Sequence, residues 1–176
     1  MSQPTIEEPQ DDGERVSAAG ERVILETFLD MYREIVKAKV RGLSEEDAVR
    51  RLVPSATTLA GIVKHLRWVE LNWFQRVLAG RPAEDFPPPP WTDEDPDGDF
   101  RLEPGETVEQ VIAEYEAECE RSRATAAGHS LDDLGTHRRM GPTSLRWIYV
   151  HMIEETARHA GHADILREQI DGTTGD

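Results

Sequence analysis

The chain has 176 residues, of which 38% are hydrophobic and 31% are charged, and this composition is typical of a single soluble domain with a substantial core. Its formal net charge is −15, from 35 acidic and 20 basic residues. Such a balance argues against nucleic-acid binding, because phosphate recognition needs a basic surface. No apolar run is long enough to cross a bilayer, so we expect no membrane association.

The chain has one cysteine, Cys119, which lies in a charged helical stretch without a CxxC partner. An intrachain disulfide is therefore excluded. We expect Cys119 to be a structural thiol and not a catalytic nucleophile. The first residues lack the basic and apolar segments of a secretion signal, and we therefore predict a cytoplasmic protein.

The N-terminal stretch is polar, acidic and interrupted by proline and glycine. We predict a disordered tail over residues 1–20, one domain over 21–172 and a short C-terminal tail over 173–176. The first long helix is expected over 21–41, since Gly42 is a typical residue just past a helix end. Its apolar side is expected to consist of Val23, Phe28, Met31, Ile35 and Val36.

A short helix should follow, with Ser44 as its N-cap and acidic residues in its first turn. The second long helix is predicted over 55–79, between a start signal at Pro54-Ser55 and a stop signal at Gly80-Arg81-Pro82. The apolar stripe of this helix consists of Leu59, Ile62, Val63, Leu66, Val69 and Trp73.

A long segment without helical pattern comes next. Residues 80–105 contain four consecutive prolines, and residues 84–106 carry nine acidic side chains against one basic one, Arg101. Prolines in this number exclude a regular helix. A loop of this length is usually either functional or disordered. Trp91, within the loop, is a candidate for covering the mouth of a pocket.

The last third of the chain predicts two more helices. Thr107 and Gln110 have the spacing of a capping box, which predicts a third helix ending near Ala127. Residues 128–142 contain three glycines and should form an irregular connector, and the fourth helix is expected over 143–170. No segment alternates in the manner of a strand. The predicted fold class is therefore all-α: a four-helix bundle with one long crossover loop.

One face of the predicted fourth helix mixes apolar residues with possible metal ligands. Residues spaced by alternating steps of four and three share one face of a helix. A carboxylate and imidazoles on such a face cost free energy unless a partner satisfies them, and a bound metal ion is the simplest partner. The residues of this face are Ile148, Met152, Glu155, His159, His162, Leu166 and Ile170.

Three residues of the chain could form one metal site. Glu155 and His159 are four positions apart, so their side chains can converge on one point, and His65 lies among apolar residues in the second predicted helix. Two histidines and a glutamate suit Zn²⁺, with Ni²⁺ as a second possibility, and leave a fourth coordination position open, as in catalytic zinc sites. The alternative is a metal-free cluster of hydrogen-bonded core residues.

The other histidines have less defined roles. His151 and His162 flank the candidate ligands, and each could carry a proton in catalysis, act as a fourth ligand or orient another ligand. The alternative for each is a surface or helix-capping imidazole. His129 and His137 fall in the connector and are expected to be exposed to solvent.

The sequence around the candidate ligands resembles the DinB-like superfamily of metal-binding four-helix bundles. The similarity covers about residues 20–172 and is carried by Leu59-Ala-Gly-Ile-Val-Lys-His65-Leu and by His151-Met-Ile-Glu-Glu155-Thr-Ala-Arg-His159-Ala-Gly-His162. Within the superfamily, the chain looks like the actinobacterial branch of unknown function that includes the mini-circle protein. It is also similar to the N-terminal domain of mycothiol-dependent maleylpyruvate isomerase.

This resemblance implies a metal site. The superfamily pattern places one histidine on the second helix and HxxxH on the last helix, whereas this chain has Glu155 at the first position of that pair, as in the ExxxH of the isomerase. Carried over residue by residue, the zinc ligands of the isomerase correspond to His65, Glu155 and His159. The isomerase has a further C-terminal domain that contributes to its active site, and we expect this chain to lack one.

The resemblance also implies thiol chemistry. We expect a transferase or isomerase that depends on a divalent metal and uses a low-molecular-weight thiol, mycothiol, on a small electrophilic substrate, with His151 or His162 as proton carrier. A metal-dependent hydrolase and a non-catalytic metal-binding or stress-response module are the alternatives. Since DinB-like proteins are often dimers, a homodimer is expected.

Overall fold

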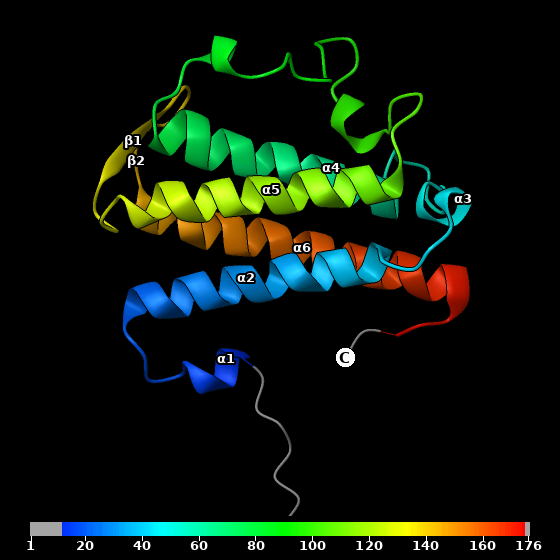
Figure 1. Cartoon of the computed structure of the whole chain (residues 1–176), viewed down its shortest axis with the longest axis horizontal. Coiled ribbons are helices and arrows are strands. Elements are labelled where there is room, and N and C mark those ends of the chain that lie inside the picture. The colour runs from blue at the N-terminus through cyan, green and yellow to red at the C-terminus, as the bar shows by residue number, and fades with distance from the viewer. Residues whose placement is uncertain (1–11, 175–176) are drawn as a thin grey trace, which may run out of the picture.

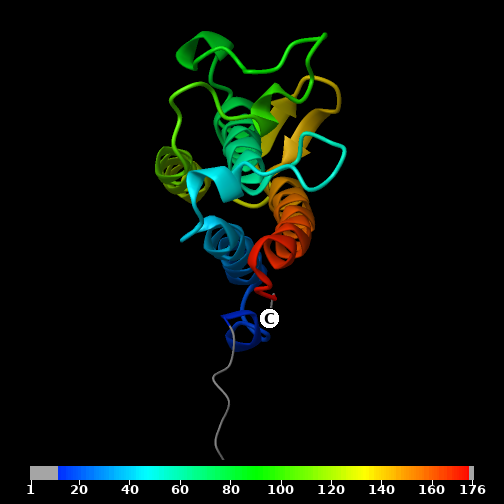
Figure 2. The same ribbon diagram turned by 90° about the vertical axis from the view of Figure 1, so that its right-hand side faces the viewer.

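The structure is a computed structural model, and it describes residues 12–174. Four long helical segments form a bundle, with most connections gathered at its two ends (Figures 1 and 2). The predicted all-α four-helix bundle is thereby confirmed. The four segments are α2 (Glu21–Val40), α4 (Leu59–Glu70) continued by η1 (Leu71–Leu78), α5 (Val108–Ala127) and α6 (Leu145–Asp171).

The helix ends follow local capping chemistry. The hydroxyl of Thr107 accepts from the backbone N–H of Gln110, and the Gln110 side chain accepts from the N–H of Thr107, which confirms the predicted capping box. Ser144 caps α6 in the same way, by accepting from the N–H of Trp147. The second helix begins later than predicted, because Thr58 and not Ser55 is its N-cap.

The second helix also changes type along its length. The expectation of one continuous helix to residue 79 is only partly right, since η1 over Leu71–Leu78 is a π-helix. Beyond its end, the N–H of Ala79 donates to the carbonyl of Phe74, the spacing of a widened turn. Such turns are rare in proteins as a whole, but those that occur are often found at functional sites.

The order of the helices requires a long crossover. In Figure 1, α2 and α6 run in one direction, and α4 and α5 both run in the other. Helix α2 packs on α6, and α4 packs on α5. Because α4 and α5 are parallel neighbours, the chain between them must return along the bundle, and this return contains η2 (Ala83–Asp85) and η3 (Gly98–Phe100).

The crossover is held firmly against α4. Gly61 is buried, and a Cβ there would overlap the carbonyl oxygen of Phe100. The buried ammonium of Lys64 donates to the carbonyl of Arg101 (2.8 Å) and pairs with the carboxylate of Glu106 (2.6 Å). The residues around η3 therefore have a defined position over α4.

The connector between α5 and α6 differs from the prediction. It contains a two-stranded antiparallel hairpin, β1 (Leu134–His137) and β2 (Gly141–Ser144), with Leu134 opposite Ser144. The prediction that no strand occurs is therefore wrong for this segment. Gly135 is buried against η1, where a Cβ would overlap the carbonyl oxygen of Val77. Close packing on η1 positions a hairpin too short to show an alternating pattern.

The N-terminal region contains one helical turn, α1 (Asp12–Arg15), which contacts α2. This turn lies within the predicted disordered tail, whose residues 1–11 fall outside the described part, as do residues 175–176 of the C-terminal tail. The short helix predicted after Gly42 is present as α3 (Glu45–Ala48), capped by Ser44. Among the described residues, no helix is long and apolar enough to cross a membrane.

The core consists of two apolar clusters. One is built around Val36, Leu66 and Tyr115, and the other around Leu29 and Phe74. The predicted apolar side of the first helix is only partly right, since Val36 is fully buried but Val23 is 48% exposed.

A buried ion pair separates these clusters along the helices. Arg33 lies between Leu29 and Val36 on α2, and Glu70 lies between Leu66 and Phe74. The guanidinium of Arg33 donates twice to the carboxylate of Glu70, at 2.7 Å each, and a third time to Asp30 at 2.8 Å. The relative exposures of Arg33 and Glu70 are 2% and 0%. Two buried charges in bidentate contact form the polar centre of the bundle.

Cys119 should be unreactive in the folded protein. Its side chain is buried beside this ion pair, and burial raises the pKa of the thiol to about 12. A neutral buried thiol is a poor nucleophile. We expect no reaction with a disulfide reagent at pH 8 until the protein is unfolded in guanidinium, when one thiol per chain should be titrated. Rapid reaction of the native protein would contradict this burial.

Candidate metal centre

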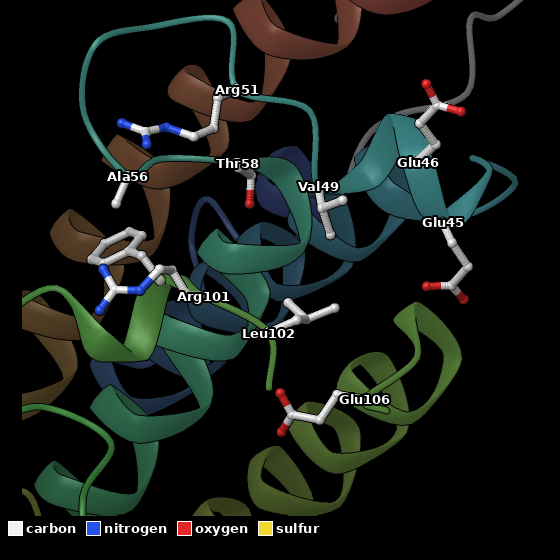
Figure 3. A pocket seen from close by; sticks show the side chains of 10 residues that line it. Glu45, Glu46, Val49, Arg51, Ala56, Thr58, Arg101, Leu102 and Glu106 are labelled. Carbon is white, nitrogen blue, oxygen red and sulfur yellow. The ribbon is translucent and has the colours of Figure 1, made fainter. Parts of the chain in front are cut away.

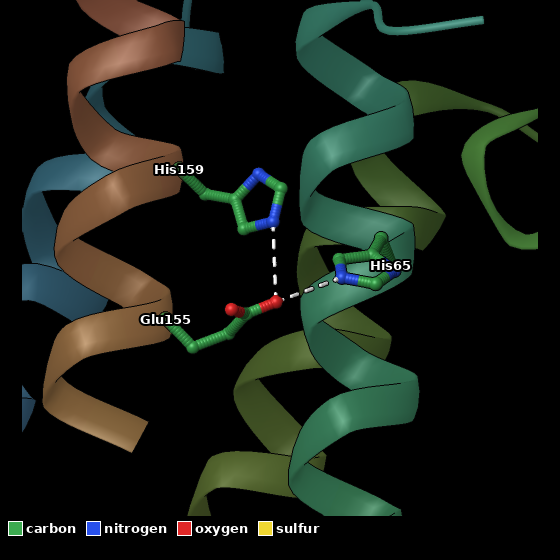
Figure 4. A group of neighbouring side chains, drawn as sticks. All are labelled: His65, Glu155 and His159. Carbon is green, nitrogen blue, oxygen red and sulfur yellow. Dashed lines mark hydrogen bonds and ion pairs between the residues drawn. The ribbon is translucent and has the colours of Figure 1, made fainter. Parts of the chain in front are cut away.

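Side chains from α4 and α6 converge on one point between these helices. His65 comes from α4, and Glu155 and His159 come from adjacent turns of α6 (Figure 4). One ligand atom from each residue can be chosen such that all three lie within 4.8 Å of one another. The sequence-based grouping of these three residues therefore matches their positions.

The two histidines approach the same carboxylate oxygen of Glu155. Nε2 of His65 and Nε2 of His159 each lie 3.3 Å from Oε1 of Glu155. The exposed fraction of the side chain is 17% for His65, 10% for His159 and 14% for Glu155. The cluster is thus mostly buried but not sealed, as a site with access for a small molecule requires.

Asp99 is a further member of the site that sequence reasoning missed. It lies in η3 of the crossover, is 7% exposed, and its Oδ2 accepts from Nδ1 of His65 at 2.7 Å. The ring of the next residue, Phe100, stacks on the ring of His65 with centroids 4.3 Å apart. These two contacts fix the orientation of His65, and they keep the Nε2 atom turned towards Glu155.

The electrostatics of the cluster favour a positive charge at its centre. Burial alone would lower the pKa of His65, but hydrogen bonds to Asp99 and Glu155 raise it to about 8. Hydrogen bonds from His159 and His65 hold the pKa of the Glu155 carboxyl well below its ordinary value, against the effect of burial. The carboxylates of Asp99 and Glu155 lie at the two nitrogens of the His65 ring. Their combined negative charge favours a cation at this position.

The donor set fits a divalent ion of the zinc type. Zinc accepts imidazole nitrogen and carboxylate oxygen, and three protein ligands are usual in catalytic sites. Metal-ligating histidines commonly donate their other N–H to a carboxylate, which is the relation of His65 to Asp99. Nδ1 of His159 is buried and has no hydrogen-bond partner among the described residues. Of the two histidines, therefore, only His65 has its ring orientation fixed by a hydrogen bond at Nδ1.

His162 lies beside the cluster but outside the three-residue group. It is exposed, and its ring centroid is 5.5 Å from that of His159. With Thr57 and Leu166 it lines a pocket of about 320 Å³. Its position next to a candidate ligand and to solvent is compatible with the predicted role as proton carrier.

His151 is also outside the group, and it lies in an aromatic cluster. Its ring stacks on Trp147 and meets Trp73 edge-on, with centroids 5.1 and 4.7 Å away. Burial lowers the pKa of His151, and the nearby charge of Glu155 does not reverse this effect. His137, expected to be exposed, is instead half-buried, and its ring stacks on Trp73 at 5.0 Å.

A larger pocket lies at the α3 end of the bundle, next to the candidate centre (Figure 3). Its volume is about 530 Å³, and its lining includes Thr58, Phe100 and Leu102. Phe100 is shared, since its ring also stacks on His65. Trp91 does not line this pocket; it packs edge-on against Trp68, with centroids 5.4 Å apart.

Asp99 should control metal affinity without being a ligand. Asp99→Ala removes the acceptor of the Nδ1–H of His65, and loss of such a partner typically weakens metal binding about 10–100-fold. Competition with a chromophoric zinc chelator would measure the change. Asp97→Ala is the matched control, because Asp97 is an exposed carboxylate two residues away. Equal zinc affinity in both variants would exclude this role for Asp99.

The comparisons with known proteins give the family of this chain. A protein-family model described as Mycothiol-S-transferase matches residues 24–172, which include all three members of the candidate metal centre and Asp99. No curated protein matches the chain at a significant level. Since the match covers most of its length, the chain belongs to the mycothiol-S-transferase family, within the DinB-like superfamily.

Proposed function

We propose that this protein is a metal-dependent S-transferase that joins mycothiol, a low-molecular-weight thiol, to a small electrophilic substrate. The observation that carries the proposal is the convergence of His65, Glu155 and His159 in a chain of the mycothiol-S-transferase family. The family supports thiol chemistry, and the histidine–glutamate cluster supports a divalent metal, with zinc as the first candidate and nickel as the second.

The candidate ligands would hold the ion through Nε2 of His65, Nε2 of His159 and the carboxylate of Glu155. Once bound there, a divalent ion would supply positive charge that favours the thiolate form of a nearby thiol. Asp99 holds the ring of His65 in place from the opposite side. Such support matters because ligand geometry set in advance need not be reorganised when substrate binds.

The chain must also remove a proton. In the proposed reaction the S–H bond of the thiol breaks, and its proton passes to His162, which is exposed and adjacent to His159. The sulfur then forms a bond to an electrophilic carbon, and the leaving group departs with the electron pair of the broken bond. Solvent afterwards accepts the proton from His162.

The pocket beside Phe100 is the proposed binding place for one of the two reactants. It borders the ring that stacks on His65, and its wall combines Leu102 with the polar groups of Thr58 and Arg51. This mixture suits a small polar molecule with an apolar part.

A transfer assay tests the proposal. Purified protein loaded with zinc should convert mycothiol and monochlorobimane, a fluorogenic electrophile, into the thioether faster than the uncatalysed reaction. Chelation should remove the enhancement, and Glu155→Gln should lack it, whereas Glu154→Gln, which alters an exposed neighbour, should retain it. Thiol-independent turnover would indicate the hydrolase alternative. Tight zinc binding without turnover of several electrophiles would favour the non-catalytic module.

The quaternary structure is a separate proposal. We propose a homodimer, on the basis of the family resemblance alone. Light scattering on the size-exclusion peak would give the mass of the particle, and a mass equal to that of the chain, 19.9 kDa, would refute the dimer.

A further inference from the structure

Most of the basic side chains of this acidic protein form ion pairs with neighbouring carboxylates. Every lysine and arginine forms an ion pair with a carboxylate of the described residues except Arg51, Arg76, Arg138 and Arg139. The chain has 35 acidic residues, so carboxylates are in excess over the basic side chains that they could pair with. Four exceptions scattered over the surface would need no explanation, but these are not scattered.

Three of the four exceptions line a single pocket. It lies between η1 and the β1–β2 hairpin, has a volume of about 350 Å³, and is lined by Arg76, Arg138 and Arg139 together with Asn72, Arg81 and His137. Arg81 is paired with Asp85, 3.3 Å away. No carboxylate is among the residues that line the pocket. The positive charge is therefore concentrated and unbalanced.

The arrangement depends on two irregular pieces of backbone. The π-helical turns of η1 present Asn72 and Arg76, and the hairpin presents Arg138 and Arg139 opposite them. Gly135 allows β1 to approach the backbone of η1 more closely than any side chain would permit. Both pieces are absent from a plain four-helix bundle, and both contribute arginines to the same pocket.

His137 gives the pocket a rigid wall and a directed donor. One face of its ring stacks on Trp73, at an interplanar angle of 14°. Its Nδ1 accepts from the backbone N–H groups of Arg139 (3.3 Å) and Met140 (3.2 Å). The ring hydrogen must then be on Nε2. The imidazole is thus held in one orientation and one tautomer, with an N–H left for a ligand.

We propose that this pocket binds an oxyanion: the phosphate or carboxylate group of a small molecule. Guanidinium groups present N–H donors in a planar fork that matches both anions, and like-charged arginines in one pocket repel each other until an anion neutralises them. Asn72 and His137 add further N–H donors. The site is distinct from the candidate metal centre, and it does not rest on the proposed transferase activity.

Titration of the ¹⁵N-labelled full chain with inorganic phosphate, and separately with acetate, tests the proposal by NMR. Sodium chloride at matched ionic strength is the reference. At least one anion should shift the amide signals of Asn72, Thr136 and His137 saturably. In the double variant Arg76→Gln/Arg139→Gln the dissociation constant should rise about tenfold or more, since hydrogen bonds between charged groups are lost. Arg15→Gln, an exposed arginine on α1, should leave it unchanged.

The two anions distinguish the source of the ligand. Tighter binding of phosphate indicates a phosphorylated molecule, and comparable or tighter binding of acetate indicates a carboxylate. The proposal is overturned if neither anion shifts these amides beyond the chloride reference, or if the double variant binds as tightly as the parent. Because both substitutions are at exposed positions, the variants should fold, and their thermal melts would verify this.

Discussion

Glu70→Ala should lower the free energy of unfolding by about 3–5 kcal/mol, because it leaves the guanidinium of Arg33 buried without its principal partner. Glu70 accepts two hydrogen bonds of 2.7 Å from Arg33, and both side chains are nearly inaccessible to water. The remaining carboxylate, Asp30, is half-buried and is shared with Arg123. It can compensate only part of the lost interaction.

Urea denaturation of the parent and the variant, followed by circular dichroism, would measure this change. The double variant Arg33→Met/Glu70→Leu should be far more stable than Glu70→Ala, since it removes both charges and fills their volume with apolar groups. Arg15→Ala disrupts an exposed pair and should alter stability by less than about 1 kcal/mol. A loss of similar size in Arg15→Ala and Glu70→Ala would contradict the special role of the buried pair.

The four-helix bundle was predictable because its helices carry local signals. The apolar stripe of α4, the capping box at Thr107 and the glycine after α6 are each visible in the sequence. The same reasoning could not find the buried ion pair, because charged residues in a helix are usually assigned to its solvated face. Arg33 and Glu70 are buried only because they meet, and their meeting depends on how α2 and α4 are packed.

The residues of the candidate site that lie on helices were predictable from the sequence, whereas the residue from the crossover was not. Glu155 and His159 share a face at a spacing of four, and His65 stands out as a histidine among apolar residues. Asp99 is one of nine acidic residues in 84–106, and nothing local distinguishes it. Asp99 reaches His65 because Lys64 anchors the crossover and because the crossover approaches α4 closely at Gly61. Both are tertiary contacts.

The irregular elements were missed for a related reason. The stripe from Leu59 to Trp73 is compatible with both an α-helix and a helix that widens near its end, so periodicity did not predict η1. The hairpin strands have four residues each, too few for alternation to be recognised. These two elements build the arginine pocket, which is why that pocket has no counterpart in the sequence analysis.

Zinc should raise the melting temperature of the metal-free protein by about 10 °C, and a chelator should reverse the shift. At a free concentration a thousand times its dissociation constant, a ligand specific for the folded state stabilises it by about 4 kcal/mol. In a domain of this size each kcal/mol corresponds to roughly 2–4 °C. The physical basis is that His65 belongs to α4 whereas Glu155 and His159 belong to α6, so one ion would tie two helices together.

The decisive comparison is the zinc-induced shift in variants, and not their melting temperatures, because His159→Ala also removes a buried side chain. His159→Ala and Glu155→Gln should each lose most of the shift, since two ligands hold zinc far more weakly than three. His129→Ala should retain it, because His129 contacts the end of α5 and lies outside the three-residue group. If His159→Ala and the parent show the same shift, zinc binds elsewhere. The polar cluster between α4 and α6 would then be a hydrogen-bonded part of the core, and the proposed thiol chemistry would lose its metal.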